Sequence, residues 1–570
     1  MSATHGKRRP AMIDEPRATD GRAPDVFRAG GWTSMRCYSE SEEVDFAIVG
    51  TGAGGGTLAC KLAEAGFSVV AFDAGPFWRP LEDFASDERE QEKLYWTDER
   101  ITGGDDPLEL GINNSGKGVG GSTVHFTMVS LRFRPDWFKS RSRLGYGFDW
   151  PIDWDDIEPY YGEVENALKI SGPVNYPWGS PRKAYPYRPH PVNAAGLVLA
   201  RGAEALGIAW SPTPLATLSA PRGRAHPCVY RGFCRIGCST NAKQSVLVTW
   251  IPRALKAGAE VRDLAMVGRI EMDRNGRATG VLYHRLGEWR VQRARNVVVA
   301  GYAIETPRLL LNSANDQFPN GLANGSGFVG THLMCHSGPN AWATMEEEIR
   351  CYKGPPSMAM SEHWNYCDEG KDFDGGYAFM SQGPLAAEWA NVVAGSRGHW
   401  GMKLRREMTL YNHMAGLEIV GEVMPRPENR VELADEEDSL GLKIPRVTFS
   451  YCDNDRRLQR HATRFMSDVL RAAGGRDLWT GEDTAHLMGG CRMGFSPDDS
   501  VVDGDGRSWE IPNLWICDGS LFPTGGGVNP SLTIQALACR IADRIQAMAA
   551  RGELARARRS RSRRTDRALA

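Results

Sequence analysis

Two short segments of this 570-residue sequence combine residue types and spacings that could do chemistry. The first is a glycine-rich turn, in which Gly50, Gly52 and Gly55 fit the pattern G-x-G-x-x-G. The first glycine permits a tight turn, the second lets the backbone approach a pyrophosphate, and the third allows close packing of helix on strand. Asp73 ends the next apolar run, where a carboxylate would accept hydrogen bonds from ribose hydroxyls. This segment predicts a dinucleotide site.

The second segment is a loop that places three thiols close together, at Cys228, Cys234 and Cys238. Soft thiolates at short spacing can hold an iron–sulfur cluster or zinc, and three ligands leave one cluster corner unheld, as in a three-iron cluster. Inert free thiols and a disulfide are the alternatives. His332 and His336 have the i, i+4 spacing of a metal pair, but without further ligands we expect no metal there.

Composition excludes several classes of protein. Hydrophobic residues make up 41% and charged residues 24% of the chain, which is a globular balance. The net charge of −2 gives no case for a nucleic-acid partner. No apolar run approaches the roughly 18 residues of a membrane helix, so we expect no transmembrane segment. The length predicts two or more domains.

Four short apolar runs predict buried strands, at 44–50, 67–75, 296–301 and 514–518. Helical patterns follow the first and third runs, and another helix is predicted from Ser531 to about Ala549. The stretch 331–455 alternates polar and apolar residues and favours an antiparallel sheet. The predicted fold class is α/β (α+β overall), with a Rossmann-like dinucleotide domain into which an antiparallel-sheet substrate domain is inserted.

The predicted boundaries follow from these patterns and from the polar chain ends. They are a flexible N-terminal arm (1–43), the first part of the dinucleotide domain (44–330, with substrate-side insertions at about 130–220), the substrate domain (331–455), the second part of the dinucleotide domain (456–549) and a basic tail (550–570).

The sequence resembles the glucose–methanol–choline (GMC) flavoprotein oxidoreductases over roughly residues 44–548. Four blocks in the family's order carry the resemblance: the N-terminal turn closed by FDAG (72–75), GKGVGGST (116–123), VVVAGYAIETPRLLLNSA (297–314), and a C-terminal stretch with AHLMGGCRMG, VVD, LWICDGSLFPT and NPSLTIQALACRIAD. The resemblance implies FAD as the cofactor. The further cofactor-binding residues that it implies are Gly118, Gly120, Gly121, Ser122, His125, Ala300, Gly301, Asp518, Gly519, Asn529, Pro530 and Thr533.

The resemblance also implies a catalytic pair. In this family a histidine begins an H-x-x-G-[TG] motif, and a second His or Asn follows near the end of the chain. Here these positions hold His486 and Asn529. The imidazole would remove the hydroxyl proton of the substrate, because its pKa lies near the working pH. The amide would donate a hydrogen bond to the substrate oxygen and stabilise developing charge.

His125 lies five residues after Gly120, where some members of the family attach FAD covalently to a histidine and others do not. We expect packing beside the flavin without a bond, with a covalent linkage as the alternative.

The cysteine loop is similar to that of the catalytic subunits of bacterial glucose, fructose and gluconate dehydrogenases, which pass electrons through a cluster to a cytochrome subunit. One cysteine often found early in that loop is missing here, and the first spacing is C-x5-C. The resemblance implies either a 3Fe-4S cluster with a small subunit and a cytochrome-type acceptor, or inert thiols.

As a function, the resemblance implies FAD-dependent oxidation of a CH–OH group of a sugar, glycoside or polyol, with hydride passed to flavin N5 and electrons passed to an acceptor other than NAD. The alternatives are an oxidase that reduces oxygen, and a flavin-bound lyase that cleaves cyanohydrins. No apolar segment follows Lys7, Arg8 and Arg9, so we expect a cytoplasmic protein. Export of the folded chain with a signal-bearing partner makes the periplasm the alternative.

Overall fold

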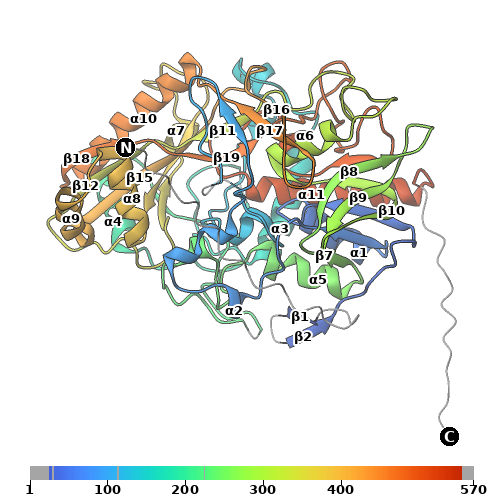
Figure 1. Ribbon diagram of the computed structural model, residues 1–570. Helices are drawn as coiled ribbons and strands as arrows, with labels where there is room; N and C mark the ends of the chain where they lie inside the picture. The colour runs from blue at the N-terminus through green and yellow to red at the C-terminus, as the bar shows by residue number, and fades with distance from the viewer. Residues whose placement is uncertain (1–24, 29–30, 112–114, 181, 224, 555–570) are drawn as a thin grey trace, which may run out of the picture.

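The computed structural model describes residues 25–28, 31–111, 115–180, 182–223 and 225–554 (Figure 1). Helix α1 (Gly55–Glu64) from the beginning of the chain packs against helix α11 (Ser531–Ala550) from its end. Both chain ends therefore build one part of the molecule, and the middle of the chain builds another, at the left of Figure 1.

The first sheet contains the four predicted strands. Its members are β3 (Val44–Val49), β4 (Val69–Phe72), β7 (Glu260–Arg262), β8 (Met266–Met272), β9 (Ala278–Arg285), β10 (Glu288–Val299) and β20 (Leu514–Ile516). The order is β7-β4-β3-β10-β9-β8, with β20 beside β10. The first half of the long strand β10 pairs antiparallel with β9, and its second half pairs parallel with β3 and β20. The predicted α/β fold class is confirmed.

Helices shield the parallel strands of this sheet from water, which explains why their sequences are continuous apolar runs. Helix α1 packs against β3, β4, α11 and α5 (Trp250–Lys256). Helix α6 (Tyr302–Asn312) follows β10 directly and packs against β8. The parallel strands therefore end next to the turns that begin α1 and α6, where open α/β sheets bind ligands.

The second sheet is antiparallel, as predicted for the middle of the chain. Its members are β6 (Ser211–Pro212), β11 (Met334–Ser337), β12 (Asn340–Thr344), β13 (Ala359–Ser361), β14 (Tyr377–Gln382), β15 (Met414–Gly421), β18 (Arg476–Gly481) and β19 (Thr484–Met488). The order is β18-β12-β15-β14-β13-β6, and β11 joins β15 to β19. Helices α4 (Ala194–Ala205) and α10 (Asp453–Ala472) pack on it.

This sheet continues past the predicted boundary at residues 455 and 456. Helix α10 crosses that boundary and packs on the second sheet, and strands β18 and β19 follow the boundary but pair within that sheet. The division at 455 therefore does not separate the two sheets, because the chain adds two more strands before it returns to the first one. The other predicted boundaries stay predictions.

The remaining elements lie around these two sheets. A three-stranded sheet contains β16 (Arg430–Glu437), β17 (Lys443–Thr448) and β5 (Ile101–Gly103). The other helices are α2 (Pro80–Asp83), α3 (Trp154–Leu168), α7 (His363–Tyr366), α8 (Ala386–Arg397) and α9 (Met402–Thr409). None of the helices in the described part of the chain is long and apolar enough to cross a membrane.

The structure corrects the prediction of a flexible arm over residues 1–43. Residues 25–28 and 31–34 pair as the hairpin β1–β2, while residues 1–24 lie outside the described residues, as does most of the predicted basic tail. Tyr38 is buried, and its backbone N–H donates to Glu260 at 2.7 Å. Arg262 donates to the Tyr38 carbonyl oxygen at 2.8 Å and pairs with Glu260. These contacts hold the segment around Tyr38 against β7, which is an edge strand of the first sheet.

We predict that Glu260→Ala lowers the free energy of unfolding by about 3 kcal/mol, because it leaves the Arg262 guanidinium buried without its charged partner. Urea unfolding measures the loss. Glu288→Ala, which removes the exposed partner of Arg290, is the control and should cost less than about 1 kcal/mol. Equal losses in the two variants would contradict the anchoring role of Glu260.

Candidate active site

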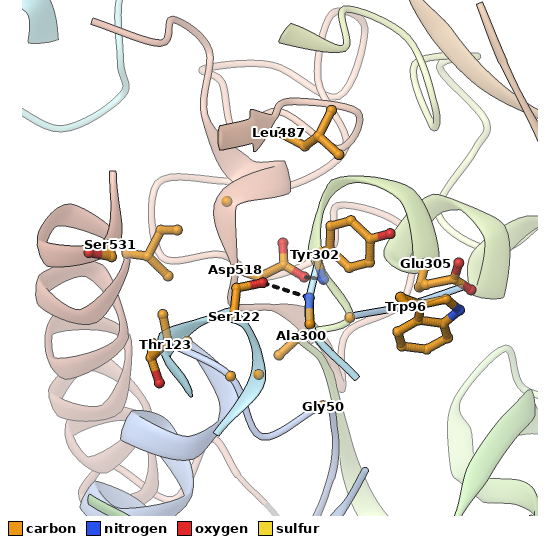
Figure 2. Close-up of a pocket in the computed structure, with 18 of the residues that line it drawn as sticks. Gly50, Trp96, Ser122, Thr123, Ala300, Tyr302, Glu305, Leu487, Asp518 and Ser531 are labelled. Atoms are coloured by element: carbon orange, nitrogen blue, oxygen red, sulfur yellow. Dashed lines mark hydrogen bonds between the residues drawn. The ribbon is translucent and has the colours of Figure 1, made fainter. Parts of the chain in front are cut away.

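A pocket lies between the two main sheets. One wall comes from the turns that follow β3, β10 and β20, and the opposite wall comes from β14, β15 and β19. Figure 2 shows the first wall, where Ser122, Ala300, Tyr302 and Asp518 gather around the loop ends of the first sheet. The pocket therefore lies at the carboxyl ends of parallel strands, as predicted for a dinucleotide site.

The predicted phosphate turn joins β3 to α1 and touches the backbone of two neighbouring loops. Gly50 has a φ of +96°, and a Cβ there would lie 2.2 Å from the Ala300 carbonyl oxygen. A Cβ on Gly54 would lie 1.8 Å from the Cys517 carbonyl oxygen. The pattern G-x-G-x-x-G leaves Gly54 at a variable position, so sequence reasoning missed it. Gly54 is needed because its backbone touches Cys517, which lies more than 450 positions away in the sequence, so no local pattern indicates the requirement.

Gly52 is constrained in a different way. A Cβ at Gly52 would approach only the Cα of Gly121, at 3.7 Å, and both glycines line the pocket. Two backbones without side chains therefore face each other where helix α1 begins. Such a cradle, next to the free N–H groups of a helix N-terminus, fits a pyrophosphate.

Asp73 lines the pocket, but its own turn uses both of its oxygens. One oxygen accepts from the Thr51 hydroxyl at 2.5 Å, and the other accepts from the Gly75 N–H at 3.1 Å. Burial raises the pKa of this carboxyl. Asp73 therefore fixes the shape of the turn, and its contact with ribose hydroxyls stays a prediction.

Asp518 holds the loops after β10 and β20 together. Its carboxylate accepts from the Tyr302 N–H at 2.8 Å (Figure 2). It also accepts from the Thr306 hydroxyl at 2.5 Å and from the Ser520 N–H at 2.8 Å. Burial raises its pKa. The carboxylate thereby positions the beginning of α6 against the C-terminal loop, and both border the pocket.

His125 is a buried histidine whose two ring nitrogens have no hydrogen-bond partner in the described part of the chain. Its ring lines the pocket and packs edge-on against Tyr95 at 5.0 Å. Burial lowers its pKa to about 3, so the ring is neutral at physiological pH. A buried polar ring without partners beside the cradle fits contact with a bound cofactor. Whether that contact is covalent stays a prediction.

The other predicted cofactor residues fall into two groups. Ser122, Ala300, Gly301, Gly519 and Pro530 line the pocket. Four do not border it and shape its surroundings instead: Gly55, Gly118, Gly120 and Thr533. The Thr533 hydroxyl, for example, shares a hydrogen bond with the Tyr161 hydroxyl at 2.8 Å.

His486 and Asn529 meet in the pocket, as predicted, although they come from different elements. Strand β19 carries His486, and the loop before α11 carries Asn529, whose amide nitrogen lies 3.2 Å from His486 Nε2. A third residue, which sequence reasoning did not assign to the site, completes the arrangement. His336 on β11 places its Nδ1 atom 3.1 Å from His486 Nδ1. The pairing of β11 with β19 brings the two rings together.

Hydrogen-bond partners determine where the protons of these rings lie. His336 Nε2 lies 2.7 Å from the Gly526 carbonyl oxygen, which can only accept, so Nε2 carries the hydrogen. Burial lowers the pKa of His336 to about 4 and that of His486 to about 3, so both rings are neutral. His336 Nδ1 must then accept from His486 Nδ1–H. His486 Nε2 then carries no hydrogen, and its lone pair accepts from the Asn529 amide.

The three cysteines of the predicted metal loop lie near one another, since Cys228 and Cys238 both add to the effect of burial in raising the pKa of Cys234. The Cys228 sulfur accepts from the Tyr230 N–H at 3.4 Å, and the Cys238 sulfur lies 3.4 Å from the Thr240 hydroxyl. Burial raises the pKa of Cys234 to about 12. Within the described ranges, no group of three or more His, Cys, Asp or Glu side chains is arranged to hold a metal ion. His332 and His336 do not share a helical face, because His332 precedes β11 and His336 lies on it.

Comparison with known families identifies the chain. The N-terminal GMC oxidoreductase family model matches residues 53–337, and the C-terminal one matches residues 425–538. The chain belongs to the GMC oxidoreductase family, a group of enzymes that act on alcohol- or sugar-type CH–OH groups, and its fold is an FAD-binding one. The resemblance stated from the sequence is confirmed.

Several relatives are similar to this chain over most of their length. The 2-methyl-1,2-propanediol dehydrogenase of Mycolicibacterium austroafricanum is 32% identical over 89% of this chain and 96% of its own. The fructose dehydrogenase large subunit of Gluconobacter japonicus is 31% identical, over 89% and 98%. The paromamine 6'-oxidase of Streptomyces fradiae is 31% identical, over 87% and 90%. Two dehydrogenases and an oxidase therefore share almost the same sequence identity with this chain.

The fold also matches solved structures. The formate oxidase of Aspergillus oryzae superposes with a TM-score of 0.64 at 15% identity, covering 91% of this chain and 100% of that one. At this identity the match shows a shared fold alone.

We predict opposite defects for two alanine substitutions in the phosphate turn. Gly54→Ala should lower the unfolding temperature of the protein, because the new methyl group would overlap the Cys517 carbonyl. Gly52→Ala should leave the unfolding temperature of the cofactor-free protein unchanged but lower FAD content by about 10-fold or more, because its methyl group points into the open cradle. Thermal unfolding and flavin absorbance measure the two effects. A Gly52→Ala protein with full FAD content would contradict the placement of the pyrophosphate.

Proposed function

We propose that this chain is an FAD-dependent dehydrogenase that oxidises a CH–OH group of a sugar, glycoside or polyol and passes electrons to an acceptor other than NAD. Its similarity to a diol dehydrogenase and to a fructose dehydrogenase large subunit supports the substrate class. Among the described residues, the observation that carries the proposal is the unprotonated Nε2 atom of His486, which lies in the pocket and accepts from the Asn529 amide.

The cradle between Gly52 and Gly121 would hold the pyrophosphate of FAD, and His125, which lines the same pocket, would contact the cofactor. When bound, FAD supplies the acceptor for the hydride. These residues fit the cofactor because they offer a backbone cradle and buried polar atoms that have no partner in the described protein.

His486 would take the hydroxyl proton of the substrate at Nε2 as the C–H bond breaks. The substrate loses a hydride from carbon and a proton from oxygen and becomes a carbonyl compound. The proton would go to His486 Nε2, and the hydride would go to the cofactor. His336 accepts from His486 Nδ1–H throughout, which stabilises the positive charge that forms on the His486 ring. The Asn529 amide would turn from His486 to the substrate oxygen and hold it in place.

We infer that an oxidase is the second candidate function, because the similarity to paromamine 6'-oxidase is as extensive as that to the dehydrogenases. A cyanohydrin lyase would use the same scaffold without any change in flavin oxidation state. A 3Fe-4S cluster at Cys228, Cys234 and Cys238, with a small subunit and a cytochrome acceptor, is a further proposal. It is supported by the loop spacing and by the similarity to a subunit of fructose dehydrogenase. An assay for iron and acid-labile sulfide tests it. A cytoplasmic location also stays a proposal.

The first test is the anaerobic visible spectrum of the flavin-loaded protein during addition of hexoses, hexitols and simple alcohols. We expect the flavin bands to bleach with a hexose or a hexitol, because the hydride moves to the cofactor. Reoxidation should be faster with a quinone or dye acceptor than with oxygen. Faster reoxidation by oxygen, with release of peroxide, would favour the oxidase. A flavin that no CH–OH compound bleaches would contradict both redox functions.

The second test concerns the histidine pair. We predict that His486→Ala lowers the limiting rate of flavin reduction about 10³-fold, since it removes the base. His336→Leu should lower that rate about 10²-fold with little change in KM, because His486 Nδ1 loses its acceptor and the other tautomer becomes accessible. His336→Gln keeps an acceptor and should retain at least about a tenth of the rate. An unchanged rate in His336→Leu, at full flavin content, would show that the tautomer assignment is wrong.

A further inference from the structure

The wall of the pocket opposite the cofactor cradle is one face of the second sheet. Along β15, Leu417 and Ile419 pack into the hydrophobic core beneath α10, while Glu418 and Val420 line the pocket. This alternation follows from the two-residue period of a strand. A polar side chain on the pocket face is therefore available to a ligand and contributes nothing to the core behind it.

Glu418 is a half-buried carboxyl group that lines the pocket and makes no hydrogen bond with another of the described residues. Burial raises its pKa to about 8, with a smaller contribution from Asp483. The raised pKa favours the protonated form, which offers both an O–H donor and an accepting oxygen. A hydroxyl group, which also donates and accepts, is its natural complement.

Contacts around Gly338 place Glu418 near the catalytic strand. A Cβ on Gly338 would lie 3.3 Å from Glu418 Oε1 and 3.1 Å from the carbonyl oxygen of Asp483. Asp483 directly precedes β19, the strand that carries His486. The carboxyl group is thus at the substrate end of the pocket and not beside the turn after β3.

Further polar atoms without partners belong to the same wall. The Ser357 hydroxyl is buried and has no hydrogen-bond partner within the described chain, and the same holds for Arg235 Nε. Arg235 is otherwise engaged, since its terminal nitrogens donate to Glu388 and, at 3.2 Å, to Gln382. Buried polar atoms without partners are costly, so this wall is incomplete without a polar ligand.

We propose that Glu418 and Ser357 form a hydroxyl-binding subsite, which selects a substrate with several hydroxyl groups over an alkyl alcohol with one. The proposal rests on the proposed function and adds to it the residues that recognise the non-reacting part of the substrate. A polyhydroxylated chain satisfies both groups, whereas an alkyl chain would leave them buried and unpaired. Sites built to bind a substrate hydroxyl reject analogues that lack it for this reason.

The test measures binding separately from turnover. Reduced, flavin-loaded protein cannot accept a hydride, so calorimetry under anaerobic conditions reports the Kd alone. The probes are D-sorbitol, D-fructose and 1-hexanol; D-sorbitol and 1-hexanol share a six-carbon chain with a terminal CH2–OH group. The wild-type protein should bind at least one of the two polyols at least about 10-fold more tightly than 1-hexanol.

Variants identify the residue that makes the distinction. Glu418→Leu should weaken polyol binding about 10- to 100-fold and leave 1-hexanol binding unchanged or stronger, whereas Glu418→Gln, which keeps a donor and an acceptor, should stay within about 10-fold of wild type. Met380→Leu is the matched control, because Met380 lies opposite Glu418 on β14 and lines the pocket without a polar group that pairs strongly. Met380→Leu should change the Kd values of the polyol and of 1-hexanol by a similar factor, so that their ratio stays the same.

Two results would overturn the subsite: tighter or equal binding of 1-hexanol by the wild-type protein, or a Glu418→Leu protein with an unchanged polyol-to-alkanol ratio at full flavin content. Failure of the proposed function looks different. In that case no CH–OH compound bleaches the oxidised flavin, whatever the ratio of Kd values in the reduced protein.

Discussion

The structure depends on the close approach of three backbones at the carboxyl ends of β3, β10 and β20. The turn after β3 lies so near the Ala300 and Cys517 carbonyl groups that Gly50 and Gly54 leave no room for a side chain. Asp518 then joins the loop after β20 to the beginning of α6. Segments from the two ends of the chain are thereby held in one arrangement, and the cradle for a pyrophosphate exists only while all three loops are in contact.

The placement of His486, the proposed base, depends on a second junction, between the two main sheets. Strand β19 belongs to the antiparallel sheet, but its carboxyl end leads into the loops of the first sheet. His486 lies on this strand, and the neighbouring strand β11 provides His336, whose bond to the Gly526 carbonyl fixes the proton positions of both rings. The left-handed backbone of His486, with a φ of +58°, marks the place where the strand turns toward the pocket.

Local patterns in the sequence predicted the elements of the first sheet and the phosphate turn, because a strand, a glycine turn and a helix follow one another within about twenty residues. The role of Gly54 and the contact between His336 and His486 could not be predicted in this way. Each depends on a pairing between distant parts of the chain, which no local period records. The same reason explains why the N-terminal segment was predicted to be a flexible arm. Its sequence is polar, and the residues that hold Tyr38, Glu260 and Arg262, lie more than 200 positions away.

The two walls of the pocket differ in how freely their residues could change. On the cofactor side, a single methyl group at Gly54 would overlap the backbone of another strand, so the turn is tied to the packing of the whole first sheet. On the opposite side, Leu417 and Ile419 stabilise the core beneath α10, while Glu418 on the other face of the strand lines the pocket. Because adjacent residues of a strand point to opposite faces, substitution on the pocket face alters recognition at little cost to the core. The cofactor turn is therefore fixed by backbone packing, whereas a side chain such as that of Glu418 can change without disturbing the core on the other face of its strand.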